Sequence, residues 1–279
     1  MSNKLGRVPR GVNFDTPEGF KRLLPPEDAL DEWQFIAREI MILQHEHTQR
    51  YYWPTKKTEK PYTGCIWNNK FRGNDFLWGA EVDGVYCCGV SMEHFFLTHQ
   101  DYMGNIFESD LDLTWNQMMM LYQYFFVWND DGKYDQGCGK GIELVGEWLK
   151  ERFLAVKQAG KGAEFDIEDA DDFDAYMATH YEYHTDPYRA KFGDYVQIQN
   201  KRNIHVPGGG HAAIFVGLEQ RVYKGVDQDV VRVFQANNSG DYNMKDGVTC
   251  GWYTIGKPDK HDPDFKRIFH FGSVTPISV

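Results

Sequence analysis

The sequence predicts an α+β fold in which helices pack on an antiparallel sheet. Segments with helical periodicity fall in the first two-thirds of the chain, and runs of β-branched and aromatic residues fall after Phe192. Runs of helices followed by runs of strands are typical of α+β folds. We expect a single domain over residues 1–279, with an N-terminal helical extension over about 1–70 and a helical insertion over about 98–191.

The spacing of apolar residues predicts where the helices lie. Residues 1–25 contain several prolines and predict an irregular lead-in. From Glu27 to about Arg50 the apolar residues recur with a helical period, and Pro26 stands near the first turn. Residues 51–75 are aromatic and turn-rich, which predicts a loop. Three further helices are expected, from Cys87 or Cys88 to His99, over Leu113–Trp128 and over Ile142–Gln158.

The strands are expected after the acidic stretch Glu164–Asp174, which we interpret as a solvated loop or a helix start. β-branched and aromatic residues gather there in runs bounded by Gly, Asn and Asp. The predicted strands are Tyr195–Gln199, His211–Leu218, Val230–Ala236 and Gly251–Ile255. We expect them to form one antiparallel sheet.

The charge and the cysteine content argue against several classes of protein. Thirty Lys and Arg against 41 Asp and Glu give a net charge of −11, and the chain has no basic stripe, so we expect no nucleic-acid partner. No apolar run approaches the ~20 residues that span a bilayer, and Met1–Phe20 lacks the apolar stretch of a signal peptide. Five cysteines, an odd number, favour free thiols in a reducing compartment. We therefore expect a cytoplasmic protein, or one that is exported by a route independent of a signal peptide.

Cys87 is the candidate nucleophile. The dipeptide Asp83-Gly84 is a strong turn signal just before it, and an apolar helix follows. A helix N-terminus lowers the pKa of a thiol, because the helix dipole and the free N–H groups favour the thiolate. The neighbouring N–H groups, including that of Cys88, can also hold an oxyanion.

His211 is the candidate general base. It follows the run Gly208-Gly209-Gly210 and begins an apolar strand, so its ring can face a cleft. A third polar group orients the imidazole in sites of this kind. An antiparallel neighbouring strand brings Gln235 or Asn237 beside His211. His205 is a competing base, but it stands just before a proline and the glycine run, which favours a loop role.

Four segments of the chain carry these residues in a fixed order. They are Trp78-Gly79-Ala80 with Gly84 and Tyr86-Cys87-Cys88-Gly89, then Gly193-Asp194-Tyr195-Val196, then His211-Ala212-Ala213-Ile214-Phe215-Val216-Gly217, and then Val233-Phe234-Gln235-Ala236. The segments resemble those of the NlpC/P60 family of papain-like cysteine peptidases and amidases. The resemblance covers roughly residues 75–97 and 192–240, under a third of the chain.

The resemblance implies a papain-like core, in which the nucleophile helix packs on the sheet that bears the base. The implied site residues are Cys87, His211 and Gln235 for catalysis, and Cys88, Trp78 and Gly210 for oxyanion and substrate binding. Two departures matter, since Tyr86 replaces the family's usual Asp and Cys88 its usual Ser. The resemblance therefore leaves two candidates for the nucleophile, Cys87 and Cys88.

The expected activity is cysteine-dependent hydrolysis of a peptide or amide bond, which in this family usually means the stem peptides of peptidoglycan. Two alternatives remain open: an acyltransferase or transglutaminase-like enzyme that uses the same thioester chemistry, and a binding module with a degenerate site. We expect no cofactor and no metal. The pairs His45/His47 and His180/His184 are too small to define a metal site.

Overall fold

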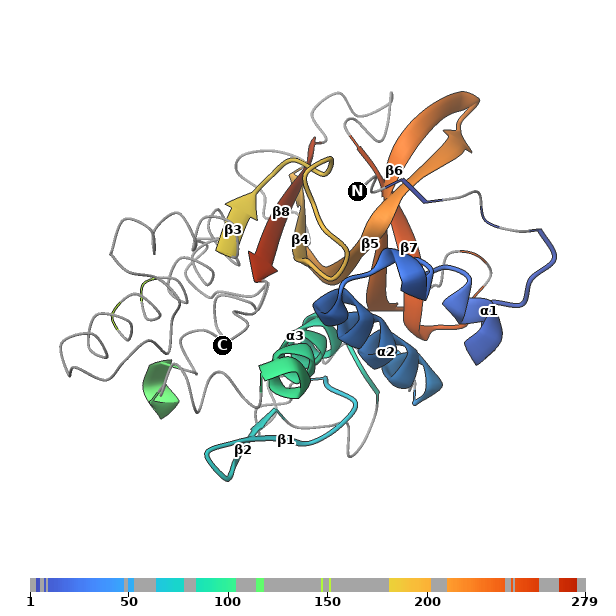
Figure 1. Ribbon diagram of the computed structural model, residues 1–279. Coiled ribbons are helices and arrows are strands. Elements are labelled where there is room, and N and C mark those ends of the chain that lie inside the picture. The colour runs from blue at the N-terminus through green and yellow to red at the C-terminus, as the bar shows by residue number, and fades with distance from the viewer. Residues whose placement is uncertain are drawn as a thin grey trace.

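In the described part of the chain, helix α3 packs on a six-stranded antiparallel sheet, and helix α2 packs against α3 (Figure 1). The computed structural model describes residues 4–5, 8, 10–47, 50–52, 64–77, 84–103, 114–117, 147, 151, 181–201, 210–238, 242, 244–255 and 266–274. Its helices are α1 (Pro17–Lys21), α2 (Glu32–Glu46) and α3 (Cys87–Met103), with a short 3₁₀ helix at Glu27–Ala29. Its strands are β1 (Asn69–Phe71), β2 (Asn74–Leu77), β3 (Tyr181–His184), β4 (Tyr195–Lys201), β5 (Gly210–Tyr223), β6 (Val226–Asn237), β7 (Gly247–Thr254) and β8 (Lys266–Val274).

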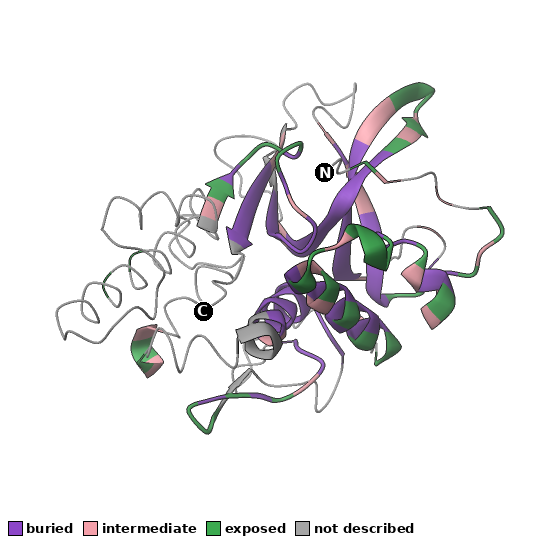
Figure 2. Cartoon of the chain, viewed as in Figure 1, coloured by how far each residue is buried: buried purple, intermediate pink, exposed green. Residues whose placement is uncertain are grey.

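The sheet has a buried core on each face. Side chains of a strand alternate between faces, so Ala212 and Ile214 of β5 join the core beneath the helices, while Ala213 and Phe215 join a second core. Helix α3 contacts β5 and β6 directly, and α2 packs on α3. The middle of the sheet is buried, whereas the far end of the β5–β6 hairpin is exposed (Figure 2). The architecture is thus a mixed α/β one with an antiparallel sheet, as the sequence predicts.

Helix α2 confirms the helix expected after Pro26, and a capping box fixes where it begins. The side chain of Asp31 accepts the backbone N–H of Gln34 at 2.9 Å, and the Gln34 side chain accepts the N–H of Asp31 at 3.3 Å. The helix predicted to start at Cys87 or Cys88 starts at Cys87. The irregular lead-in over residues 1–25 is wrong in part, because α1 forms there with Thr16 as its N-cap.

The four predicted strands are present as β4, β5, β6 and β7, and all four are longer than expected. Strands β3 and β8 were not predicted. β8 inserts between β3 and β4, so a strand from the end of the chain completes the sheet (Figure 1). The predicted loop over 51–75 is also wrong in part, since β1 and β2 form a hairpin there through Arg72 and Gly73, both at positive φ.

The predicted helical insertion lies largely outside the described residues. Within it, residues 115–117, 147 and 151 are helical. The acidic stretch Glu164–Asp174 also lies outside the described residues. No helix in the described part of the chain is both long and apolar enough to cross a membrane.

Candidate active site

Two separate segments fix the backbone just before Cys87. The backbone of Val85 exchanges hydrogen bonds with residues 50–52, both at 2.9 Å. The N–H of Tyr86 donates to the carbonyl of Gly64 at 3.2 Å, and the Val90 N–H donates to the Tyr86 carbonyl at 3.1 Å as the first turn of α3 closes. Cys87 therefore stands at the N-terminus of a 17-residue helix, and backbone hydrogen bonds with residues 50–52 and with Gly64 fix the two residues before it.

Gly64 is required for this arrangement. It has φ +66°, and a Cβ there would lie 2.1 Å from the Tyr86 ring. A side chain at this position would displace the residue that precedes Cys87.

His211 and Gln235 meet across the β5–β6 pair. His211 Nε2 lies 2.6 Å from Gln235 Oε1, and the Tyr253 hydroxyl donates to the same oxygen at 2.8 Å. A carboxamide oxygen can only accept, so Nε2 carries a proton and donates it. The other ring nitrogen, Nδ1, is left to exchange a proton with a partner. A Cβ at position 251 would lie 2.2 Å from the Gln235 amide nitrogen, so Gly251 leaves room for this side chain.

The imidazole of His211 and the Cys87 sulfur are close enough that each shifts the pKa of the other. The pKa of Cys87 lies well below its usual range. A hydrogen bond with Cys88 lowers it, as do the charge and hydrogen bond of His211 and the N–H of Ala212, and together they outweigh burial, which raises it. The two sulfur atoms of Cys87 and Cys88 are 3.7 Å apart.

The pKa of His211 moves in the opposite direction. Burial alone would lower it, but the charge of Cys87 and the hydrogen bonds with Cys87 and Gln235 raise it overall. A lowered thiol pKa and a raised imidazole pKa both favour a thiolate–imidazolium pair. Such a pair supplies a charged nucleophile and a proton donor side by side.

Tyr51 is a further polar side chain near the sulfur, and sequence reasoning did not single it out. Burial first, and then the charges of Cys87 and Cys88, raise its pKa to about 12. Its phenol is therefore neutral at physiological pH and remains a hydrogen-bond donor. Tyr51 reaches this place because it bridges to Val85, a pairing between positions 34 residues apart that no local motif announces.

The structure brings together three of the predicted site residues, Cys87, His211 and Gln235. Cys88 is fully buried, and its sulfur lies against that of Cys87. Gly210 begins β5 next to His211. Of the two candidates for the third group, Gln235 holds the ring, whereas the Asn237 side chain accepts the N–H of Asn238 at 2.7 Å.

Other candidate residues from the sequence lie outside the described residues or pack in the core. Trp78 and the competing base His205 lie outside the described residues, as does His180. His45 is buried and stacks on Phe20. Across the described segments, no group of three or more His, Cys, Asp or Glu side chains gathers as a metal site.

A cavity of about 720 Å³ lies elsewhere on the molecule. The N-terminal segment, residues 25–34, residues 188–192 and the middle of β5 line it, and neither Cys87 nor His211 does. Comparisons of the chain with protein-family models, with curated proteins and with solved structures find no match.

Proposed function

We propose that this chain is a cysteine amidase or peptidase of the NlpC/P60 kind, with a papain-like core. The observation that carries the proposal is the pairing of Cys87, at a helix N-terminus, with His211, whose ring Gln235 holds through Nε2. Nucleophile, base and orienting group stand in the order that thiol hydrolases need. Helix α3 also packs on the strand that bears the base, which is the core arrangement that the family resemblance implies.

The mechanism follows from the charges of the pair. The Cys87 thiolate attacks the acyl carbon, the C=O electron pair moves to oxygen, and the N–H groups at the start of α3 stabilise the oxyanion. His211 then gives its proton to the leaving amine as the C–N bond breaks, leaving a thioester. Water attacks the thioester, His211 takes a proton from it, and the C–S bond breaks to release the carboxylic acid and the thiolate. Gln235 keeps Nδ1 of His211 aimed at the sulfur throughout.

The substrate class rests on the family resemblance rather than on the geometry. That resemblance favours a small peptide, with the stem peptide of peptidoglycan as the first candidate. Transfer of the acyl group to an amine would use the same thioester, and the mass of the product separates the two reactions. A degenerate binding module would need no lowered thiol pKa, so the lowered pKa of Cys87 favours an enzyme.

Turnover of purified muropeptides tests the proposal. We expect the full chain to release new amine termini, detected by mass spectrometry, and Cys87→Ala to lower the rate by at least about 1,000-fold, because the Cys87 thiolate is the attacking group in the proposed mechanism. Cys250→Ala serves as the matched control, since Cys250 is a buried cysteine of β7 and should keep most of the activity. Full turnover by Cys87→Ala would remove Cys87 from the mechanism. A product joined to an added amine would show acyl transfer instead.

A further inference from the structure

We propose that Cys87 and Cys88 form a site of reversible oxidation, at which a hydroperoxide oxidises Cys87 and Cys88 closes a disulfide onto it. The inference takes the Cys87 thiolate from the proposed function but does not require amide hydrolysis. It concerns a second chemistry of the same sulfur, one that switches the nucleophile off and on.

The contact between the two thiols is the first observation. Cys87 and Cys88 are consecutive residues in the first turn of α3, and their sulfur atoms lie 3.7 Å apart, in van der Waals contact. A disulfide bond is about 2.05 Å long, so the sulfurs need to approach by less than about 2 Å. Both residues are thiols outside any disulfide in the structure.

The second observation is the difference between the two sulfurs. Cys87 interacts with His211 and is 5% exposed, whereas Cys88 is fully buried. Oxidation selects thiolates that a small oxidant can reach, which favours Cys87 as the sulfur that meets the peroxide. Cys88 is shielded from the oxidant and in direct contact with Cys87, which is the position of a resolving thiol.

The other described cysteines are Cys65 and Cys250. The Cys65 thiol donates to the carbonyl of Gly89 at 3.3 Å, and Cys250 lies on β7. The sulfur of Cys87 lies against that of Cys88.

The chemistry balances in two steps. The Cys87 thiolate attacks one oxygen of hydrogen peroxide, the O–O bond breaks, and the departing hydroxide takes the proton of His211 to form water, leaving a sulfenic acid. The Cys88 sulfur then attacks the Cys87 sulfur, the S–O bond breaks, and the hydroxide leaves as water with the Cys88 proton. Two thiols and one peroxide give one disulfide and two waters, so the cysteines are oxidised and the peroxide is reduced.

The resulting bond should be easy to reduce. A trans peptide holds consecutive Cα atoms about 3.8 Å apart, below the roughly 4.4–6.8 Å that unstrained disulfides span. Strained disulfides have high reduction potentials and are the labile ones. The bond would therefore block the nucleophile under oxidation and release it to an ordinary dithiol, while it also protects Cys87 from irreversible oxidation to the sulfinic acid.

Mass spectrometry of the full chain tests the inference without an activity assay. The protein is treated with hydrogen peroxide, alkylated with iodoacetamide and digested. We expect the peptide that contains Cys87 and Cys88 to lose the mass of two hydrogen atoms, to escape alkylation, and to regain both thiols in dithiothreitol. In Cys88→Ala we expect Cys87 to react with dimedone as a sulfenic acid and then to pass to the sulfinic acid, which dithiothreitol does not reverse. Cys250→Ala is the control and should behave as wild type.

Two results would overturn the inference: equal dimedone labelling of wild type and Cys88→Ala, or a disulfide between Cys87 and another cysteine. Cys88→Ser, which keeps the size of the side chain, replaces Cys88→Ala if the latter does not fold. Disulfide formation in a chain without amidase activity would refute the proposed function alone. Amidase activity without the disulfide would refute this inference alone.

Discussion

Cys87 is a buried thiol, and burial alone would make it harder to ionise. Its ionisation depends on partners that a buried site normally lacks: a neighbouring thiol, an imidazole and a backbone N–H. His211 faces the converse difficulty, since burial disfavours its cation. Each charge is stabilised by the other, so the pair is stable only as a unit. The orientation of the ring, which Gln235 sets, therefore contributes to the lowered pKa of the sulfur, beside the hydrogen bond with Cys88.

Replacement of Gln235 by Ala should raise the pKa of the Cys87 thiol. Without the Oε1 acceptor, 2.6 Å from Nε2, the imidazole loses the bond that fixes its direction. The rate of alkylation by iodoacetamide at about pH 6 tracks the thiolate fraction, so it should fall about tenfold for each unit of rise in the pKa. The measurement is the labelling rate of Cys87 against pH.

Gln235→Glu is the informative companion variant, because it retains an acceptor and adds a negative charge beside the ring. It should retain labelling at about pH 6, whereas Gln235→Ala should not. Equal labelling of the wild type and both variants would show that Gln235 does not position the imidazole.

Local sequence patterns predicted Cys87 and His211. A turn signal precedes the helix of Cys87, and a run of glycines precedes the strand of His211. Strand order alone left Gln235 and Asn237 open, and the family resemblance favoured Gln235. The influence of His211 on the pKa of Cys87 favours Cys87 over Cys88, and it requires two segments far apart in the sequence to meet. Tyr51 was beyond local reasoning, because a long-range backbone bridge places it.

At the scale of elements, Glu93 ties helix α3 to the segment that precedes β1. Its fully buried carboxylate accepts the N–H groups of Ile66 and Trp67 at 3.0 and 2.8 Å. The side-chain amides of Gln44 and Asn69 donate to it as well, each at 3.0 Å. All four partners are donors, and both carboxyl oxygens of Glu93 accept from them. The same segment holds Tyr86 through Gly64, which links this anchor to the entry of α3.

Glu93 should make the stability of the protein depend on pH. Burial raises the pKa of Glu93 to about 7, although its four hydrogen bonds oppose the rise. Because the folded protein holds this proton more tightly than the unfolded chain, the contribution of Glu93 is fully present below about pH 4.5 and is lost as the pH rises through about 7. The loss amounts to about 3 kcal/mol. Glu93→Gln, which carries no titratable proton, should lack this part of the slope.

Urea unfolding at pH values from 4.5 to 7.5 measures the effect as a difference between wild type and variant. Asp194 has a pKa raised by burial to about 6 and contributes its own slope, which cancels in that difference. Glu32→Gln, an exposed position on α2, is the control and should follow the wild type. Parallel curves for wild type and Glu93→Gln would contradict the prediction.

The elements differ in how far local sequence determines them. β4, β5, β6 and β7 are apolar enough to be found from composition. β3, with the sequence Tyr-Glu-Tyr-His, is short and half polar, and it forms a strand because β8 pairs with it. β8 begins with Lys266 and Arg267 and lies between two partners that the chain supplies long before it. Strand formation there is a tertiary effect, which a single-sequence pattern does not contain.

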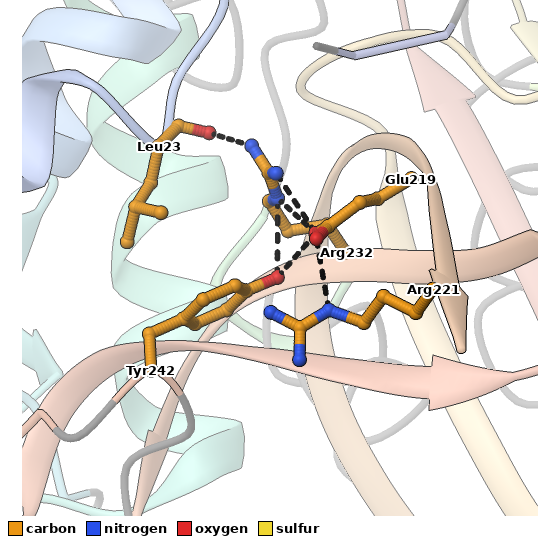
Figure 3. A network of polar contacts seen from close by, with 5 residues as sticks. All are labelled: Leu23, Glu219, Arg221, Arg232 and Tyr242. Carbon is orange, nitrogen blue, oxygen red and sulfur yellow. Dashed lines mark hydrogen bonds and ion pairs between the residues drawn. The ribbon is translucent and has the colours of Figure 1, made fainter. Parts of the chain in front are cut away.

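At the scale of the whole molecule, a buried ion pair joins the N-terminal part to the sheet (Figure 3). Glu219 of β5 and Arg232 of β6 lie 2.8 Å apart, and both side chains are almost wholly buried. Arg232 also donates to the carbonyl of Leu23 at 2.6 Å, and the Tyr242 hydroxyl donates to Glu219 at 2.6 Å. Arg221 donates to the other Glu219 oxygen at 2.8 Å. Segments over 200 residues apart thus share one polar cluster.

Removal of one partner from this cluster should destabilise the whole fold. Glu219→Gln leaves the Arg232 guanidinium buried without its counter-charge, which costs about 3–5 kcal/mol. For a chain of this size that corresponds to a fall in Tm of roughly 6–20 °C, measured by calorimetry.

The double variant Glu219→Leu with Arg232→Met removes both charges and should lose less stability than Glu219→Gln, because no buried charge is left unpaired. Glu18→Gln, which breaks the exposed pair with Lys21, should change the stability by no more than about 1 kcal/mol. If Glu219→Gln unfolded at the temperature of Glu18→Gln, the cluster would not be what holds the N-terminal segment to the sheet.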